Sequence, residues 1–192
     1  ISGSGTALNF SNKSVNGTNT LLFRNPTGTP LLPSTAAKYY IDLENKEWTP
    51  IGNATNKFKG EFDGNNKTIS NLNVGNKKMS NVGLFGYTEE GKIQNVHVHN
   101  ADVEGRLNVG VVAGTPYTSV YENIKVTGEV EVDGFSYVGG VLGKDAYANV
   151  TNVTVDVEEG SYVNANSVEN DIAYRTYVGG VIGFMGEGSH TV

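Results

Sequence analysis

Apolar and polar residues alternate in short segments of this chain, and the segments recur at a regular interval. Valine or isoleucine occupies one face of three of them, at Val96 and Val98, Ile124 and Val126, and Val153 and Val155. His97, Lys125 and Thr154 fall on the opposite face. A period of two predicts β-strands with one buried face and one solvent-facing side. No apolar 3.6-residue periodicity lies between these segments, so we expect almost no helix.

A short element with glycine at one or both ends precedes each strand at a fixed distance. The three copies are Gly83-Leu84-Phe85-Gly86, Val111-Val112-Ala113-Gly114 and Gly140-Val141-Leu142-Gly143. They lead to Asn95, Asn123 and Asn152, and the offsets 95−83, 123−111 and 152−140 are all twelve. A fourth copy begins at Gly180, and no partner strand follows it before Val192. A fixed repeat of this length is typical of a solenoid; a leucine-rich repeat would need spaced leucines and a helical return.

The strands that begin with asparagine predict how the coils stack. With Asn71 counted as the first, the asparagines are 24, 28 and 29 residues apart, which is one coil of three short strands and three turns. In a parallel stack an asparagine amide can bond the asparagines of the coils above and below, and asparagine tolerates the left-handed backbone of a tight corner. We therefore expect Asn71, Asn95, Asn123 and Asn152 to form one column and the apolar residue after each to enter the core.

The repeat does not extend over the whole chain. Residues 1–45 hold short apolar pieces separated by Gly, Pro and Asn, including Pro26, Pro30 and Pro33. Proline cannot supply a ladder hydrogen bond, and the end of a solenoid needs covering, so this segment is predicted to be an irregular N-terminal cap. Residues 46–192 are predicted to form the solenoid repeats, continuous with the cap in one domain.

Composition and charge exclude several classes of function. The 192 residues include 25 Gly, 5 Pro and no Cys, which suits many tight turns and a fold without disulfides. The formal net charge is −6 and the pI is near 5.0, so no nucleic-acid partner is expected. No run of apolar residues is long enough to span a membrane, and we expect any leader to have been removed before Ile1.

Few residues suggest metal or cofactor chemistry. His97 and His99 share a strand face, which is a spacing that can bind a metal, but the chain has no Cys and only one other histidine, His190. An H-E-x-x-H motif is absent from this segment, so the segment is not the zinc-binding part of a metalloprotease. The sequence predicts neither a metal site nor a cofactor.

Carboxylates give a second candidate chemistry. Glu61 and Asp63 could act as a pair on a polysaccharide, but such a site needs acids in register on adjacent coils. Asp102, Asp133 and Asp156 fall seven, ten and four residues after their asparagines (102−95, 133−123, 156−152), so we expect them not to stack. Asp63-Gly64-Asn65 is predicted to be a turn, and whether Asp63, Asn65 and Asn66 hold calcium is left open. No catalytic residue is assigned.

One arc of the coil varies in length, which marks a candidate partner surface. The distance from the column asparagine to the next repeat is 16, 17 and then 28 residues (111−95, 140−123, 180−152), a surplus of eleven (28−17) between Asp156 and Tyr177. Loops that project from a rigid scaffold tend to carry binding residues. We assign the candidate surface to Tyr137, Tyr162, Tyr174, Arg175 and Tyr177. The alternatives are an inert insertion and tyrosines that serve only as stacking residues.

Motifs from Trp48 onward carry a resemblance to a known family. They are Trp48-x-Pro50-Ile51-Gly52, Phe58-x-Gly60-x-Phe62-Asp63-Gly64-Asn65, and the G-L-F-G or G-G-V-[LI]-G elements with their N-[VI]-x-V strands. Together they resemble the GLUG-motif repeats of bacterial cell-surface proteins over residues 48–192, with Val111 standing where the first glycine belongs. Such repeats occur in adhesin-like proteins and in the non-catalytic N-terminal part of some immunoglobulin A metalloproteases.

The resemblance implies an all-β, right-handed parallel β-helix or β-roll with an extracellular or bacterial cell-surface location. We expect a non-catalytic adhesion or scaffold module that binds a glycan or a host protein. The alternatives are a fragment of a polysaccharide-active β-helix enzyme and the stalk of a larger surface protease. End-to-end association through the terminal coil is also left open.

Overall fold

The structure, a computed structural model, describes residues 11–15, 18–22, 40–166 and 175–186, and within these ranges it contains strands and no helix. Strands β1 (Ser11–Val15) and β2 (Thr18–Leu22) form an antiparallel hairpin that meets the first coil at Thr20 and Glu61. Every other described strand pairing is parallel. The predicted cap prolines Pro26, Pro30 and Pro33 lie outside the described residues.

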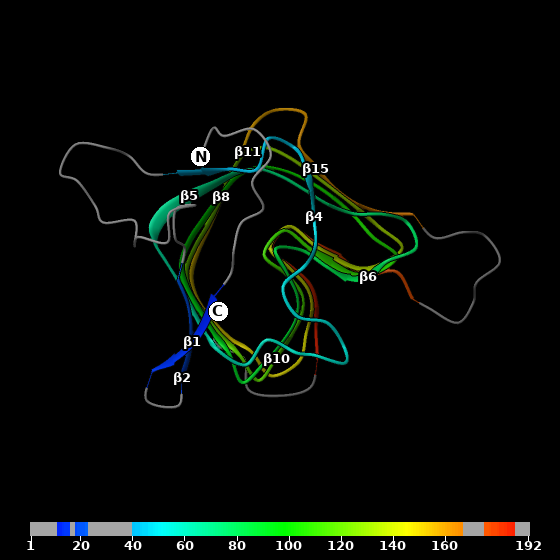
Figure 1. Ribbon diagram of the computed structural model, residues 1–192. Helices are drawn as coiled ribbons and strands as arrows, with labels where there is room; N and C mark the ends of the chain where they lie inside the picture. The colour runs from blue at the N-terminus through cyan, green and yellow to red at the C-terminus, as the bar shows by residue number, and fades with distance from the viewer. Residues whose placement is uncertain (1–10, 16–17, 23–39, 167–174, 187–192) are drawn as a thin grey trace.

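Three stacks of parallel strands make up the solenoid, as the view along the coils in Figure 1 shows. The long sheet contains β3 (Tyr40–Asp42), β4 (Glu47–Trp48), β5 (Glu61–Gly75), β8 (Lys92–Glu104), β11 (Val120–Gly134), β14 (Asn149–Val157) and β15 (Tyr162–Ala165). The second sheet contains β7 (Phe85–Glu89), β10 (Ala113–Tyr117), β13 (Leu142–Asp145) and β17 (Ile182–Met185). The third sheet contains β6 (Ser80–Val82), β9 (Leu107–Gly110), β12 (Ser136–Gly139) and β16 (Val178–Gly179). The prediction of an all-β parallel solenoid is confirmed, with about four turns.

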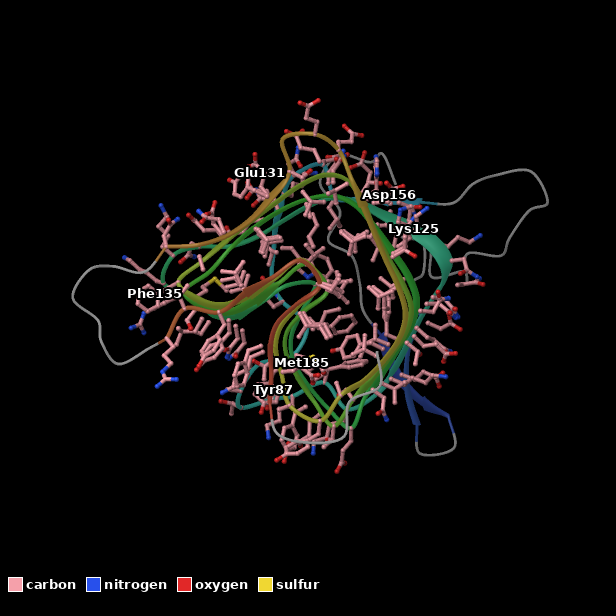
Figure 2. The ribbon with its side chains drawn as sticks, turned by 180° about the vertical axis from the view of Figure 1, so that it is seen from behind. Tyr87, Lys125, Glu131, Phe135, Asp156 and Met185 are labelled. Atoms are coloured by element: carbon pink, nitrogen blue, oxygen red, sulfur yellow. The ribbon has the colours of Figure 1, made fainter. Side chains whose placement is uncertain are left out.

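The predicted interior and exterior of the strands are also confirmed. Ile124 lies between Val96 below and Val153 above, and both Val96 and Ile124 are only 1% exposed. Lys125 is exposed, and Figure 2 shows it projecting outward from the coil. Burial is less complete in the last coil, where Val155 is 36% exposed although its counterpart Val126 is fully buried.

The asparagine column exists in the middle and upper coils. Asn95, Asn123 and Asn152 all have left-handed backbone, with φ of 55°, 56° and 53°. The Asn123 side-chain amide donates to Asn95 Oδ1 at 2.9 Å, and that of Asn152 donates to Asn123 Oδ1 at 2.7 Å. Asparagine therefore both tolerates the corner and links the coils, as the spacing of the repeats predicts.

The position of Asn71 was predicted wrongly. Asn71 accepts from the Asn100 amide at 3.2 Å and donates to Asp42 at 2.9 Å, so it belongs to a second column, one corner further along the coil. In the coil below, the partner of the Asn95 side chain is Asp63, which pairs with Gln94 and whose carboxylate accepts from the Asn95 amide at 3.0 Å. The period is therefore 29 residues (100−71) and not 24. The cause of the error is that each coil has two similar corners in its long strand.

A β-bulge shifts the register partway along the long sheet. Thr127 pairs with His99, but Val130 pairs with Ala101, so β11 holds one more residue than β8 between these pairs. Gly128 stands at the corner that Asn100 occupies in the coil below, and a Cβ on Gly128 would collide with the Asn100 side chain. Beyond this corner, a residue of β11 therefore lies one position further from Asn123 than its partner in β8 lies from Asn95.

Candidate functional site

His97 is a bridging residue between three coils. One ring nitrogen lies 2.9 Å from Thr68 Oγ1 in the coil below, and the other lies 2.8 Å from Thr127 Oγ1 in the coil above. Burial is the main reason that the pKa of His97 is lowered, and the nearby charges of Lys125 and His99 lower it further. Among the described residues no three His, Asp or Glu side chains converge on a point that could hold a metal ion.

Asp63 is the base of the asparagine column. Its carboxylate accepts from the backbone N–H of Asn65 at 2.7 Å, from the Asn95 amide at 3.0 Å and from the Gln94 amide at 3.1 Å. The bond to Asn65 closes the turn that the sequence predicts here. Glu61 shares the Gln94 amide with Asp63, at 3.0 Å. Both carboxylates thus hold neighbouring side chains in place.

Asp102, Asp133 and Asp156 do not stack on one another, as predicted, but two of them stack in register with glutamates of adjacent coils, which was not expected. Glu131 pairs with Asp102 of the coil below, and Asp133 pairs with Glu104. We call these four residues the acidic patch, and Figure 2 shows Glu131 projecting outward from the long sheet. Two features of the sequence explain why this alignment was not predicted. The bulge adds one residue before Glu131, and the partner of each aspartate is a glutamate.

Burial and neighbouring like charges raise the proton affinity of Asp102 within the acidic patch. Burial and the neighbouring carboxylates Glu131, Glu104 and Asp133, in that order of importance, raise the pKa of Asp102. Asp133 has neutral partners in the next coil, because the Tyr162 hydroxyl and the Asn164 amide each donate to it at 3.0 Å. The hydrogen bond to Asp133 is also the main reason that the pKa of Tyr162 is raised to about 12.

The outer faces of the second and third sheets face each other. Figure 1 shows the ribbon turning inward between β6 and β10, and a hydrogen bond between the Thr115 and Asn81 side chains joins the two sheets across this turn. A Cβ on Gly143 of β13 would lie 2.5 Å from the Val109 nitrogen of β9, so only glycine permits this approach. In the lower coils the Asn81 side-chain oxygen accepts from Thr115 at 2.7 Å and from Asn108 at 2.8 Å.

Aromatic residues replace these polar ones in the upper coils. Tyr137 stands above Asn108, and Tyr177 stands above Tyr137, with their rings stacked at 5.2 Å and an angle of 9°. Phe184, from the second sheet, meets Tyr137 and Tyr177 edge-on at 5.3 Å and 4.8 Å. Lys144 Nζ lies 5.0 Å from the centre of the Tyr137 ring. We call Tyr137, Lys144, Tyr177 and Phe184 the aromatic cluster.

The five residues of the predicted partner surface are not all in one place. Tyr137 and Tyr177 are brought together, whereas Tyr162 lies at the acidic patch. Arg175 has an exposed side chain, and its carbonyl oxygen accepts from the Ser136 hydroxyl. Tyr174 lies outside the described residues. That these residues bind a partner stays a prediction.

Most of the eleven surplus residues lie beyond β15. Val178 comes thirteen positions after Ala165 (178−165), whereas Val138 comes four positions after Gly134 in the coil below (138−134), a surplus of nine. The other two lie in the turn between β14 and β15 (162−157 against 131−128). Strand β15 is therefore part of the coil. A deletion intended to remove the surplus residues should spare Tyr162–Ala165.

Lys144 and Phe184 were missed by the sequence analysis. Each stands four residues after the first glycine of its repeat, Gly140 and Gly180. That common offset predicts that they share a column, which the pairing of Lys144 with Phe184 confirms. The contact of this column with the tyrosines depends on how two sheets face each other, for which the strand pattern carries no signal.

Comparison with known proteins shows that the chain is similar in sequence to parts of two longer proteins. It is 42% identical over 98 residues to halomucin of Haloquadratum walsbyi, a match that covers 49% of the chain and 1% of halomucin. It is 26% identical over 149 residues to a protein of Evansella cellulosilytica named as a Gly-rich membrane protein, covering 60% of the chain and 17% of that protein. No family model and no solved structure matches the chain.

In the part of the chain that the structure describes, no helical segment has the length and apolar character needed to cross a bilayer.

Proposed function

We propose that this chain is a surface-associated, non-catalytic scaffold module of the GLUG-repeat kind, which displays side chains on stacked coils for adhesion to a glycan or a host protein. The observation that carries this proposal is the use of polar side chains as links between coils. Asp63, Asn95, Asn123 and Asn152 form one continuous hydrogen-bonded column, and His97 bridges two threonines. Residues that could have supplied chemistry are thus engaged in holding the stack together.

The two similar proteins support the proposed location. One is named halomucin and the other is named as a Gly-rich membrane protein, and both names suit a protein at the cell surface. The chain covers only a small share of each, so their similarity supports the location and leaves the ligand to experiment.

Surface location can be tested on intact cells of the source organism. An antibody raised against residues 40–166 should label cells without permeabilisation, and external protease should remove the signal. An antibody against a ribosomal protein is the control for cell integrity. Labelling that appears only after permeabilisation would refute the surface location. Screening the purified chain against glycan and host-protein arrays then tests adhesion.

The acidic patch supports a second candidate, an activity on polysaccharides. Paired carboxylates, one of which has a raised pKa, are the arrangement by which glycosidases supply a general acid and a base or nucleophile. Asp102 has the raised pKa and pairs with Glu131. If the patch is catalytic, the chain should release new reducing ends from a polysaccharide, and Asp102→Asn should abolish the release. No release from a broad panel by the wild-type chain would exclude this candidate.

A further inference from the structure

We propose that Asn53 is a modification site, at which an oligosaccharide is attached to the side-chain amide nitrogen. Asn53 begins the tripeptide Asn53-Ala54-Thr55, which is a sequon of the Asn-x-Thr type that oligosaccharyltransferases recognise. This inference rests on the proposed surface location, because these enzymes act on exported chains. It goes beyond adhesion by assigning a covalent substituent and its position on the solenoid.

The loop at residues 53–56 stands out from the solenoid while both of its ends are fixed. Before the loop, the Ile51 N–H donates to the Leu84 carbonyl at 3.0 Å, and after it the Phe58 N–H donates to the Tyr87 carbonyl at 3.0 Å. All residues of the loop are exposed. Figure 1 shows the loop, in cyan, projecting to the side of the stacked strands after β4. A substituent on this loop therefore meets solvent and leaves the stacking of the coils intact.

The Asn53 side chain is held with its oxygen toward the loop backbone. Asn53 Oδ1 accepts from the backbone N–H groups of Thr55 at 2.9 Å and Asn56 at 2.8 Å. The nitrogen lies at the other end of the same planar amide, and among the residues that the structure describes none accepts a hydrogen bond from it. Thr55, whose hydroxyl completes the sequon, is exposed as well. The loop thus presents to solvent both groups that a transferase must contact.

The two hydrogen bonds to Asn53 Oδ1 also favour the loss of a proton from the amide nitrogen. An amide nitrogen is a weak nucleophile, because its lone pair is delocalised into the carbonyl group. Two donors on the oxygen withdraw electron density and make the N–H groups easier to deprotonate. In the transfer, a bond forms between Nδ2 and the anomeric carbon of the sugar, and the bond from that carbon to a polyprenyl diphosphate carrier breaks. The amide proton passes to a base of the transferase, and the carrier leaves as the diphosphate.

The other sequons with described side chains are less suitable. In the sequon at Asn152 the acceptor nitrogen is already used, since it donates within the asparagine column at 2.7 Å. In the sequon at Asn66 the hydroxyl is used, since Thr68 Oγ1 lies 2.9 Å from a ring nitrogen of His97. The sequon at Asn149 is extended in β14 and paired with β11, so it cannot bend into an enzyme site without losing ladder bonds. Sequons whose side chains lie outside the described part of the chain begin at Asn9, Asn12 and Asn16.

The test measures transfer to the whole purified chain in its folded state. The reagents are a single-subunit oligosaccharyltransferase that needs only the three-residue sequon and a polyprenyl diphosphate-linked oligosaccharide as donor. Four synthetic peptides, each with one of the described sequons, give the rates without a fold. Mass spectrometry of tryptic peptides locates the product, and the peptide of residues 47–57 contains Asn53 as its only sequon.

Two pairs of variants separate the acceptor nitrogen and the hydroxyl from the fold of the loop. In Asn53→Asp a carboxylate oxygen accepts the same two backbone bonds, so the loop is kept and only the acceptor nitrogen is lost. Asn149→Asp is the matched control at another exposed sequon. Thr55→Ala keeps the backbone donor and removes the hydroxyl, and Thr55→Ser keeps both.

Relative to its peptide, Asn53 in the folded chain should be modified at least about tenfold faster than each of the other three described sequons. Asn53→Asp and Thr55→Ala should abolish this product, whereas Asn149→Asp and Thr55→Ser should retain it. Equal transfer to the four sequons of the folded chain, or faster transfer to one of the other three, would overturn the inference.

The chain isolated from cells of the source organism gives an independent readout. The tryptic peptide of residues 47–57 from this chain should carry an oligosaccharide on Asn53. Unmodified Asn53 in a chain that antibody labelling detects on intact cells would overturn the inference and leave the surface location standing.

Discussion

Two groups of side chains stack along the outer face of the same long sheet with opposite consequences. In the asparagine column, Asn123 donates to Asn95 at 2.9 Å and accepts from Asn152 at 2.7 Å. In the acidic patch, Glu131 stands in register with Asp102, and both are carboxylates. Both groups lie on parallel coils of one sheet, so their opposite consequences for stability come from the chemistry of the side chains that meet.

The comparison shows which residues a parallel stack selects. A side chain that carries both a donor and an acceptor bonds to its own copy in the next coil, so its repetition stabilises the fold. A side chain with charge of one sign meets its own charge, and like charges placed directly opposite destabilise a sheet. The chain relieves part of this repulsion by placing the neutral residues Tyr162 and Asn164 above Glu131 and Asp133.

The largest effect on the free energy of unfolding is expected in the core beneath the asparagine column. Ile124→Ala removes a side chain that is 1% exposed and should lower the free energy of unfolding by about 2 to 5 kcal/mol, because it leaves a cavity. Lys125→Ala, on the outward face of the same strand, should change it by less than about 0.5 kcal/mol. Urea unfolding of both variants measures the difference. Equal effects would mean that the inner and outer faces are misassigned.

The asparagine column is broken at its centre by Asn123→Ala. This change removes two amide bonds and leaves alanine in a left-handed conformation, so we expect the free energy of unfolding to fall by about 2 kcal/mol. Asn123→Gly removes the same bonds without the backbone strain and should cost about 1 kcal/mol. A neutral result for both variants would show that the column contributes no stability.

The acidic patch should respond in the opposite direction. Glu131→Gln removes one of two stacked like charges, and we expect it to raise the free energy of unfolding by about 0.2 to 1 kcal/mol at pH 7 and low salt. Glu122→Gln is the matched control, because Glu122 lies 3.5 Å from Lys92 and its loss should be neutral or slightly destabilising. The stabilisation by Glu131→Gln should shrink in high salt; a gain that is independent of salt would contradict charge repulsion as its cause.

The pH dependence of stability distinguishes Asp102 of the acidic patch from Asp42, which lies at the base of the second asparagine column. The pKa of Asp102 is raised above its ordinary value of 3.8, so the folded state binds this proton more tightly than the unfolded state does. Its contribution to stability is therefore greatest below pH 3.8 and is lost as the pH rises through the raised pKa. Asp102→Asn should accordingly stabilise the chain more at pH 7 than at pH 4, as measured by urea unfolding.

Asp42, at the base of the second asparagine column, provides the opposite case. Hydrogen bonds from the backbone of Glu44 and then from the Asn71 amide lower the pKa of Asp42 below 3.8. Its contribution is present above pH 3.8 and is lost as the pH falls through the lowered pKa. Asp42→Ala should therefore destabilise the chain at pH 7 and do so less at pH 2. The same trend in both variants would remove the contrast between the two groups.

The sequence by itself determined the features that repeat with a fixed local spacing. The alternation around Ile124 predicted its burial, and the constant interval of twelve residues placed Asn95, Asn123 and Asn152 in one column. Local spacing suffices here because strand period and corner conformation are properties of a few consecutive residues. The all-β solenoid follows from the repetition of such units.

Only the tertiary structure decided which residues of different coils and sheets meet. One extra residue at the bulge after Thr127 brings Glu131 over Asp102, and the choice between two similar corners brings Asn71 under Asn100. The contact of Phe184 with Tyr137 and Tyr177 depends on two sheets that approach closely through glycine, at positions such as Gly143. Register and sheet approach result from packing summed over whole coils, so counting along the chain cannot supply them.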